Sequence, residues 1–174
     1  MIMFKYLCSF CLALLILSCS NNDDSTIETN INLVTGMDLR ADEFTEPIRL
    51  GNPNIFAKSS VAYPNPTFNV LNIALNGNQN VQSVFIINGL KTKSFQDVDF
   101  SSILNLNSYS SEQISSESFE EFEINNTVDG VVVNLENYDE GYYRLFIETN
   151  NGFEWHNIYK GTLDIEELID EWDD

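Results

Sequence analysis

The residues that could do chemistry are few, and their types limit the reactions open to this chain. His156 is the sole histidine, and it falls in an alternating stretch beside Trp155. One histidine cannot supply the usual zinc ligand sets, and the absence of cysteine after residue 19 leaves no thiol nucleophile there. The serines form no Gly-x-Ser-x-Gly motif. We therefore predict no catalytic residue, metal site or cofactor, a protein that is not an enzyme, and a solvent-facing structural role for His156.

The charge of the chain is strongly negative, with a formal net charge of −19 from 27 acidic and 8 basic residues. Such a chain repels phosphate backbones, so nucleic acid is excluded as a partner. Composition alone leaves a glycosidase carboxylate pair open. However, no stretch predicts two acids facing a cleft, and no loop has the ligand spacing of a dedicated Ca²⁺ site. We interpret most of the carboxylates as solvated charge.

Cys19 is the residue whose surroundings predict a specific modification. Lys5 gives a small positive start, and residues 7–17 are mostly apolar, a run too short to span a membrane comfortably. The run ends in Ile16-Leu17-Ser18-Cys19, which resembles a bacterial lipobox. That resemblance implies cleavage before Cys19, diacylation of its thiol and anchoring in a membrane through the lipid. The alternative is an ordinary signal peptide with an incidental cysteine.

Residues 1–18 are therefore predicted to be a lipoprotein signal peptide, and residues 19–30 a flexible tether. Residues 20–24 are polar or acidic and cannot contribute to a core. An acidic run at this place resembles the surface-display signal of lipoproteins of the Bacteroidota type. The resemblance implies an outer-membrane location and favours the cell surface over the periplasmic face.

Aromatic residues gather late in the chain and are the candidates for a binding surface. Tyr138, Tyr142 and Trp155 fall close together around a predicted hairpin. If they share an exposed face, they could stack on sugars. The alternative is that about half of them belong to the core and the others cover its rim.

The stretch that organises the other elements is Tyr63-Pro64-Asn65-Pro66. Two prolines fix φ and remove two backbone donors, so this segment cannot lie inside a β-ladder. Leu71, Ile73 and Leu75 then recur at every second position, which predicts a strand over residues 70–75 with one face buried.

Further strands follow from apolar alternation and from turn residues between the runs. Residues 84–87 are apolar on both faces, which is typical of a strand in the middle of a layered structure. Short alternating pieces at residues 37–39 and 48–50 predict one or two edge strands added to the main structure. The remaining strands are expected at about residues 82–87, 91–95, 119–124 and 131–135, with a hairpin of residues 142–149 and 153–159.

The motif order resembles a known family of secretion domains. Residues 63–73 carry YPNP followed by VLNI, residues 84–91 read VFIINGLK, and residues 141–147 read GYYRLFI. Together they resemble the C-terminal sorting domains of type IX secretion cargo. The resemblance implies an immunoglobulin-like β-sandwich over about residues 61–95 and 131–160.

Two segments depart from that family pattern. Residues 96–127 are rich in Ser, Asn and Glu and form an insertion, in which Phe100, Ile103 and Leu104 have helical spacing. Residues 162–174 form an acidic tail with apolar residues at helical spacing. We expect the tail to be a short docked helix, with a partner-binding peptide as the alternative.

The sequence thus predicts an all-β fold, an immunoglobulin-like antiparallel β-sandwich of about seven to nine strands over residues 31–161. The predicted function is a non-catalytic, lipid-anchored outer-membrane or cell-surface lipoprotein that binds an unidentified protein or glycan partner. Two alternatives stay open. One is a type IX secretion sorting-type domain, and the other is a carbohydrate-binding module.

Overall fold

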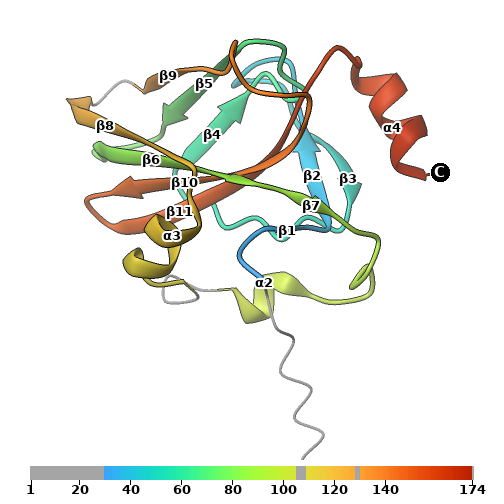
Figure 1. The fold of residues 1–174 in the computed structure, drawn as a ribbon, viewed down its shortest axis with the longest axis horizontal. Helices are drawn as coiled ribbons and strands as arrows, with labels where there is room; N and C mark the ends of the chain where they lie inside the picture. Colours follow the sequence, from blue (N-terminus) through green and yellow to red (C-terminus); the bar gives the residue numbers. More distant parts are fainter. Residues whose placement is uncertain (1–29, 105–108, 128–129, 174) are drawn as a thin grey trace, which may run out of the picture.

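The computed structural model describes residues 30–104, 109–127 and 130–173, and these form a mostly β structure (Figure 1). Several of its sheets are antiparallel, and a short helix follows the last strand. The predicted signal peptide, Cys19 and nearly all of the predicted tether lie outside the described residues. No helix in the described part is long and apolar enough to cross a membrane.

The largest sheet has four strands in the order β11-β10-β6-β8. The predicted hairpin is confirmed, because β10 pairs antiparallel with β11 from Gly141–Lys160 to Thr149–Gly152. β6 takes the central place that its two apolar faces predicted, since Val84 and Ile86 pack in one core cluster and Phe85 and Ile87 in another. The bounds are β6 Val81–Asn88, β8 Glu120–Thr127, β10 Gly141–Thr149 and β11 Gly152–Lys160.

A second sheet has three antiparallel strands in the order β4-β5-β9, with bounds Ser60–Tyr63, Val70–Leu75 and Val131–Asn134. The predicted strand over residues 70–75 is confirmed. Leu71, Ile73 and Val133 from this sheet share one buried cluster with Leu145 and Ile147 from β10. This cluster joins the two sheets through their side chains.

The N-terminal strands pair differently from the prediction. β2 (Gly36–Leu39) and β3 (Ile48–Gly51) pair with each other in a separate two-stranded sheet and are not edge strands of a larger one. β1 (Leu33–Val34) pairs in parallel with β7 (Leu90–Lys91). The predicted strand over residues 91–95 is wrong beyond Lys91, because the strand ends there and a turn covers residues 94–97.

The insertion is built into the structure. It contributes α2 (Phe100–Ile103), α3 (Ser111–Glu117) and β8, which pairs with β6 at the edge of the large sheet. The helical turn predicted at Phe100 is confirmed, with Asp99 as its N-cap. Figure 1 shows both helices below the large sheet, and Phe100 and Ile114 are buried in the cluster that covers this face.

The acidic tail forms α4 (Ile165–Asp173), which confirms the expected helix. Leu168 and Trp172 are buried against Met37 and Leu39 of β2 and Leu50 of β3. Figure 1 shows α4 beside these two strands, at the edge of the structure.

The Tyr63–Pro66 segment is a junction between elements. Asn65 is 1% exposed, and its backbone pairs with that of Arg40 just after β2. Its side-chain amide donates to the carbonyl oxygens of Asp38 (2.8 Å) and Asn157 (3.1 Å), and its Oδ1 accepts from the Tyr159 N–H (3.0 Å). Asn65 therefore ties β2 to β11 and positions one wall of the hollow described below.

Candidate functional site

The three aromatic residues predicted to share a binding surface lie in three different places. Trp155 is 1% exposed, so its ring offers no face to a ligand. It stacks on Phe56 at 4.9 Å between ring centroids, and its Nε1 donates to the Asn54 carbonyl oxygen at 2.9 Å. Trp155 is therefore a core residue, and its proposed role in binding is corrected.

Tyr142 belongs to the contact between α4 and the rest of the protein. Its ring lies 5.8 Å from that of Trp172 and 5.1 Å from that of Tyr159, between centroids. Burial raises the pKa of Tyr142, and the neighbouring carboxylate of Glu171 adds to this effect. Tyr142 is half-buried beneath the helix and is well placed to hold it.

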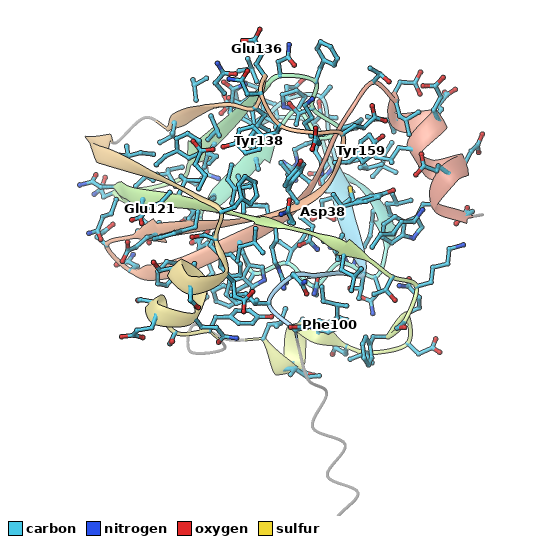
Figure 2. All side chains as sticks on the ribbon, in the orientation of Figure 1. Asp38, Phe100, Glu121, Glu136, Tyr138 and Tyr159 are labelled. Atoms are coloured by element: carbon cyan, nitrogen blue, oxygen red, sulfur yellow. The ribbon has the colours of Figure 1, made fainter. Side chains whose placement is uncertain are left out.

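Tyr138 is the one of the three that lines a surface hollow, of about 450 Å³, which we call the aromatic hollow. The ring centroids of Phe119, Tyr138 and Tyr143 lie 5.4–6.1 Å apart, and Phe119 is 47% exposed. The lining residues are Asn88, Phe119, Glu120, Asn137, Tyr138, Asp139 and Tyr143. Figure 2 shows Tyr138 far from Phe100, toward the opposite end of the protein.

Polar groups surround the rings of the aromatic hollow. The Tyr138 hydroxyl donates to the carboxylate of Glu120, and the Tyr143 hydroxyl donates to the Asp139 carbonyl oxygen at 2.8 Å. Both bonds restrain the rings, and burial raises the pKa of Tyr143, so its hydroxyl stays protonated at neutral pH. A flat aromatic face bordered by amides and carboxylates can pack against a sugar ring and accept hydrogen bonds from its hydroxyls.

A second hollow, of about 290 Å³, lies where β2, β3, β4 and β11 meet, and we call it the polar hollow. No local sequence pattern pointed to this hollow beyond His156, because its residues come from distant segments. Six of the polar residues in its lining are Asp38, Arg40, Arg49, Ser60, His156 and Asn157. His156 therefore lines a hollow and is partly buried, which corrects the expectation that it faces open solvent.

Ser60, one of the lining residues of the polar hollow, is hydrogen-bonded to a buried carboxylate. Glu154 is 4% exposed and accepts hydrogen bonds from the hydroxyls of Ser59 (2.7 Å) and Ser60 (2.6 Å) and from both of their backbone N–H groups. Burial acts to raise the pKa of Glu154, but these hydrogen bonds outweigh it and lower the pKa. Glu154 is therefore a charged structural group at neutral pH.

The pairing of Ser60 with His156 (2.9 Å from Oγ to Nε2) invites comparison with a hydrolytic dyad. A carboxylate can only accept, so Ser60 donates its one hydroxyl proton to Glu154, and Nε2 of His156 must donate to Ser60. Burial lowers the pKa of His156 to about 4, which makes it a weak base. Ser60 is thus held away from the role of nucleophile, and the arrangement suits binding better than catalysis.

His156 makes the stability of the protein sensitive to mild acid. Its pKa is about 4 in the fold and about 6.5 when unfolded, so the unfolded chain binds a proton first as the pH falls. Stability is therefore lost between pH 6.5 and 4, by at most about 3 kcal/mol. Urea unfolding of the full chain at pH 7 and pH 5 measures the larger part of this loss, about 2 kcal/mol.

The matched variant for this experiment is His156→Gln, which cannot take up a proton. It should lose less stability than the native chain between pH 7 and pH 5. Equal losses in the two proteins would show that carboxylates alone cause the acid sensitivity.

Other buried polar residues were missed by the sequence reasoning. Arg144 is fully buried beside Trp155, and Asn54 bonds to Leu33, Arg144, Trp155 and Asn157. Both occupy positions that a simple alternating pattern does not mark. No group of three or more His, Cys, Asp or Glu residues is arranged to hold a metal ion among the residues that the structure describes.

Comparison with known proteins gives no relative. No family model, no curated protein and no solved structure matches this chain.

Proposed function

We propose that this protein is a non-catalytic binding module, held at the outer membrane by a lipid on Cys19 and displayed on the cell surface. The leader and the Ile16-Leu17-Ser18-Cys19 motif support the anchor. The observation that carries the binding role is the aromatic hollow, where Phe119 is 47% exposed beside two tyrosines that hydrogen bonds hold in place. A large ring that stays exposed contributes little to the stability of the fold, so its exposure in such a hollow favours a role in ligand binding.

The fold that we propose for the body is an immunoglobulin-like β-sandwich. The four-stranded and three-stranded sheets share one buried cluster, which supports two sheets packed face to face. The proposed resemblance to a type IX secretion sorting domain rests on the same strands, in the order of their sequence motifs.

The alternative of a cleaved secretion signal fits the packing less well. Cleavage near Tyr63 would remove β1, β2 and β3, whose Val34, Met37, Leu39 and Leu50 pack against Tyr159 and α4. Separating them would expose apolar surface on both pieces. This packing supports retention of the whole body as one unit.

The intact mass of the protein extracted from membranes tests the anchor and the retention together. The expected mass is that of residues 19–174 plus acyl chains. A mass that lacks acyl chains would overturn the anchor. A mass that lacks the residues from about Tyr63 onward would favour the sorting-signal alternative.

We further propose that the ligand of the aromatic hollow is a carbohydrate. Rings flanked by Glu120, Asp139 and two asparagines offer stacking together with acceptors and donors for hydroxyl groups. The hydrogen bond between Tyr138 and Glu120 fixes the orientation of one ring before the ligand arrives, which lowers the entropic cost of binding.

Phe119→Ala is expected to weaken glycan binding at least about tenfold, because it removes the most exposed stacking surface of the hollow. The measurement is a broad glycan array with the full chain, followed by titration with any sugar that binds. The matched control is Phe44→Ala, whose ring is 88% exposed elsewhere and should not affect binding. If no glycan on the array binds, or if the two variants bind with equal affinity, the proposal of a carbohydrate ligand is wrong.

A further inference from the structure

The polar hollow gathers positive charge in a chain that has little of it. The sequence contains three arginines, and Arg144 is buried in the core. The other two, Arg40 and Arg49, come from separate segments and line the same hollow. The two guanidinium groups therefore form a local positive region in a chain whose formal net charge is −19.

The two arginines are only partly neutralised. Arg49 Nε lies 3.4 Å from Asp38 Oδ1, and the Arg49 side chain is 70% exposed. The guanidinium of Arg40 makes no hydrogen bond or ion pair with any residue in the described ranges. His156 is neutral at pH 7 because its pKa is about 4. The lining therefore has two positive charges against one negative. Arg40 forms no ion pair there and has only a longer-range charge interaction with Asp42, which lies outside the lining.

An unsatisfied acceptor lies in the same lining. Asn157 is 1% exposed, and its Nδ2 donates to the Gly36 carbonyl oxygen (2.8 Å) and to Asn54 Oδ1 (2.6 Å). Its Oδ1 is buried and has no hydrogen-bond partner among the described residues. A buried acceptor without a partner is unfavourable, and a ligand that brings an O–H or N–H donor would satisfy it.

We propose that the polar hollow binds a small hydroxylated carboxylate, such as an acidic monosaccharide. The carboxylate bonds to Arg40, whose planar fork matches its two oxygens, and a hydroxyl group donates to the Oδ1 of Asn157. A volume of about 290 Å³ accommodates one such molecule but not a long chain.

The overall negative charge of the protein does not oppose this binding at physiological salt. Charges separated by more than about 8 Å are largely screened there, so the field at the ligand comes mainly from the residues of the lining. The carboxylate of Glu154 keeps its negative charge, but it is not part of the lining, and five hydrogen bonds from Ser59 and Ser60 occupy its oxygens. The site is therefore selective for an anion that also carries hydroxyl groups.

The test is calorimetric titration of the full chain in detergent at pH 7 and low salt. The probe is D-glucuronate, and the comparison ligands are D-glucose, which lacks the carboxylate, and inorganic phosphate. Glucuronate is expected to bind at least about tenfold more tightly than either, because only it satisfies both Arg40 and Asn157.

Arg40→Gln should weaken glucuronate binding at least about tenfold, since it removes the unpaired guanidinium. Lys93→Gln removes the same charge at an exposed site outside the hollow and should leave the affinity unchanged. The titrations with glucuronate, glucose and phosphate are carried out in a Phe119→Ala background as well, so that sugar binding in the aromatic hollow does not contribute to the comparison. Absence of glucuronate binding, equal binding of glucose or phosphate, or equal affinity in Arg40→Gln and Lys93→Gln would overturn the proposal.

Discussion

Arg144→Ala is expected to lower the free energy of unfolding by about 3–5 kcal/mol, as measured by urea denaturation of the full chain. Arg144 is fully buried, and its Nη1 donates to the Ile31 carbonyl oxygen (3.0 Å) and to the Tyr109 hydroxyl (3.2 Å). Its Nη2 donates to the Asn54 carbonyl oxygen at 2.6 Å. Removal of the side chain leaves a cavity and withdraws the donor from each of these groups.

Aromatic rings replace the missing counter-ion of Arg144. The guanidinium lies 5.5 Å from the ring centroid of Tyr109, 5.7 Å from that of Phe146 and 5.8 Å from that of Trp155. Burial lowers the pKa of Arg144, while the hydrogen bond and charge interaction with Tyr109 oppose that effect. The cation is thus stabilised by ring faces and carbonyl oxygens, and Arg144 ties β10 to three other segments.

Two variants separate the causes of the loss. Arg144→Met keeps most of the volume and removes the charge, so it should cost less than Arg144→Ala. Arg49→Ala removes an arginine whose side chain is 70% exposed and should change stability by no more than about 0.5 kcal/mol. A denaturation midpoint for Arg144→Ala equal to that of Arg49→Ala would contradict the structural role.

Glu154→Ala is expected to cost about 4 kcal/mol of stability, because it removes the acceptor from four donors at once. The backbone N–H groups of Ser59 and Ser60 cannot rotate toward other partners, whereas the two hydroxyls can. Each buried N–H left without a partner costs about 1–3 kcal/mol. Urea unfolding at pH 7 measures the loss.

The control for Glu154 is Glu136→Ala, since Glu136 is exposed at the rim of the protein, as Figure 2 shows. It should leave the unfolding midpoint nearly unchanged. Glu154→Gln keeps the shape but turns an amide NH₂ toward the serine donors, so it should also be clearly destabilised. A Glu154→Gln variant as stable as the native chain would show that the space occupied by this side chain matters more than its charge.

Local patterns predicted the elements whose stabilising contacts are close in sequence. The hairpin of β10 and β11 needs only alternation on each side of the turn at Asn150 and Asn151, and α4 needs only a cap and helical spacing. The chain does not continue as a strand beyond Lys91, and the cause is again an interaction between residues close in sequence. The Ser94 N–H bonds to the Thr92 hydroxyl at 3.1 Å, and such a turn competes with strand pairing.

Trp155 illustrates what alternation cannot decide. A period of two places it on one face of β11, but it does not say whether that face is covered. Tyr109 comes from the insertion and Phe56 from the loop before β4, and both cover the indole ring. Only the tertiary structure could make this tryptophan a core residue and leave Tyr138 at the surface.

Local residue patterns were enough to predict the β-rich character of the chain, the central strand β6, the last hairpin and the C-terminal helix, because these follow from the periodicity of neighbouring residues. Which polar groups are buried, and which of them meet, depends instead on how distant segments pack. Arg144 and Glu154 lie in strands where a charge would normally face solvent. They are buried because Ile31, Asn54, Ser59 and Ser60, distant in sequence, bring hydrogen-bond partners to them. Pairing across such distances depends on the assembled fold, and no local pattern specifies it.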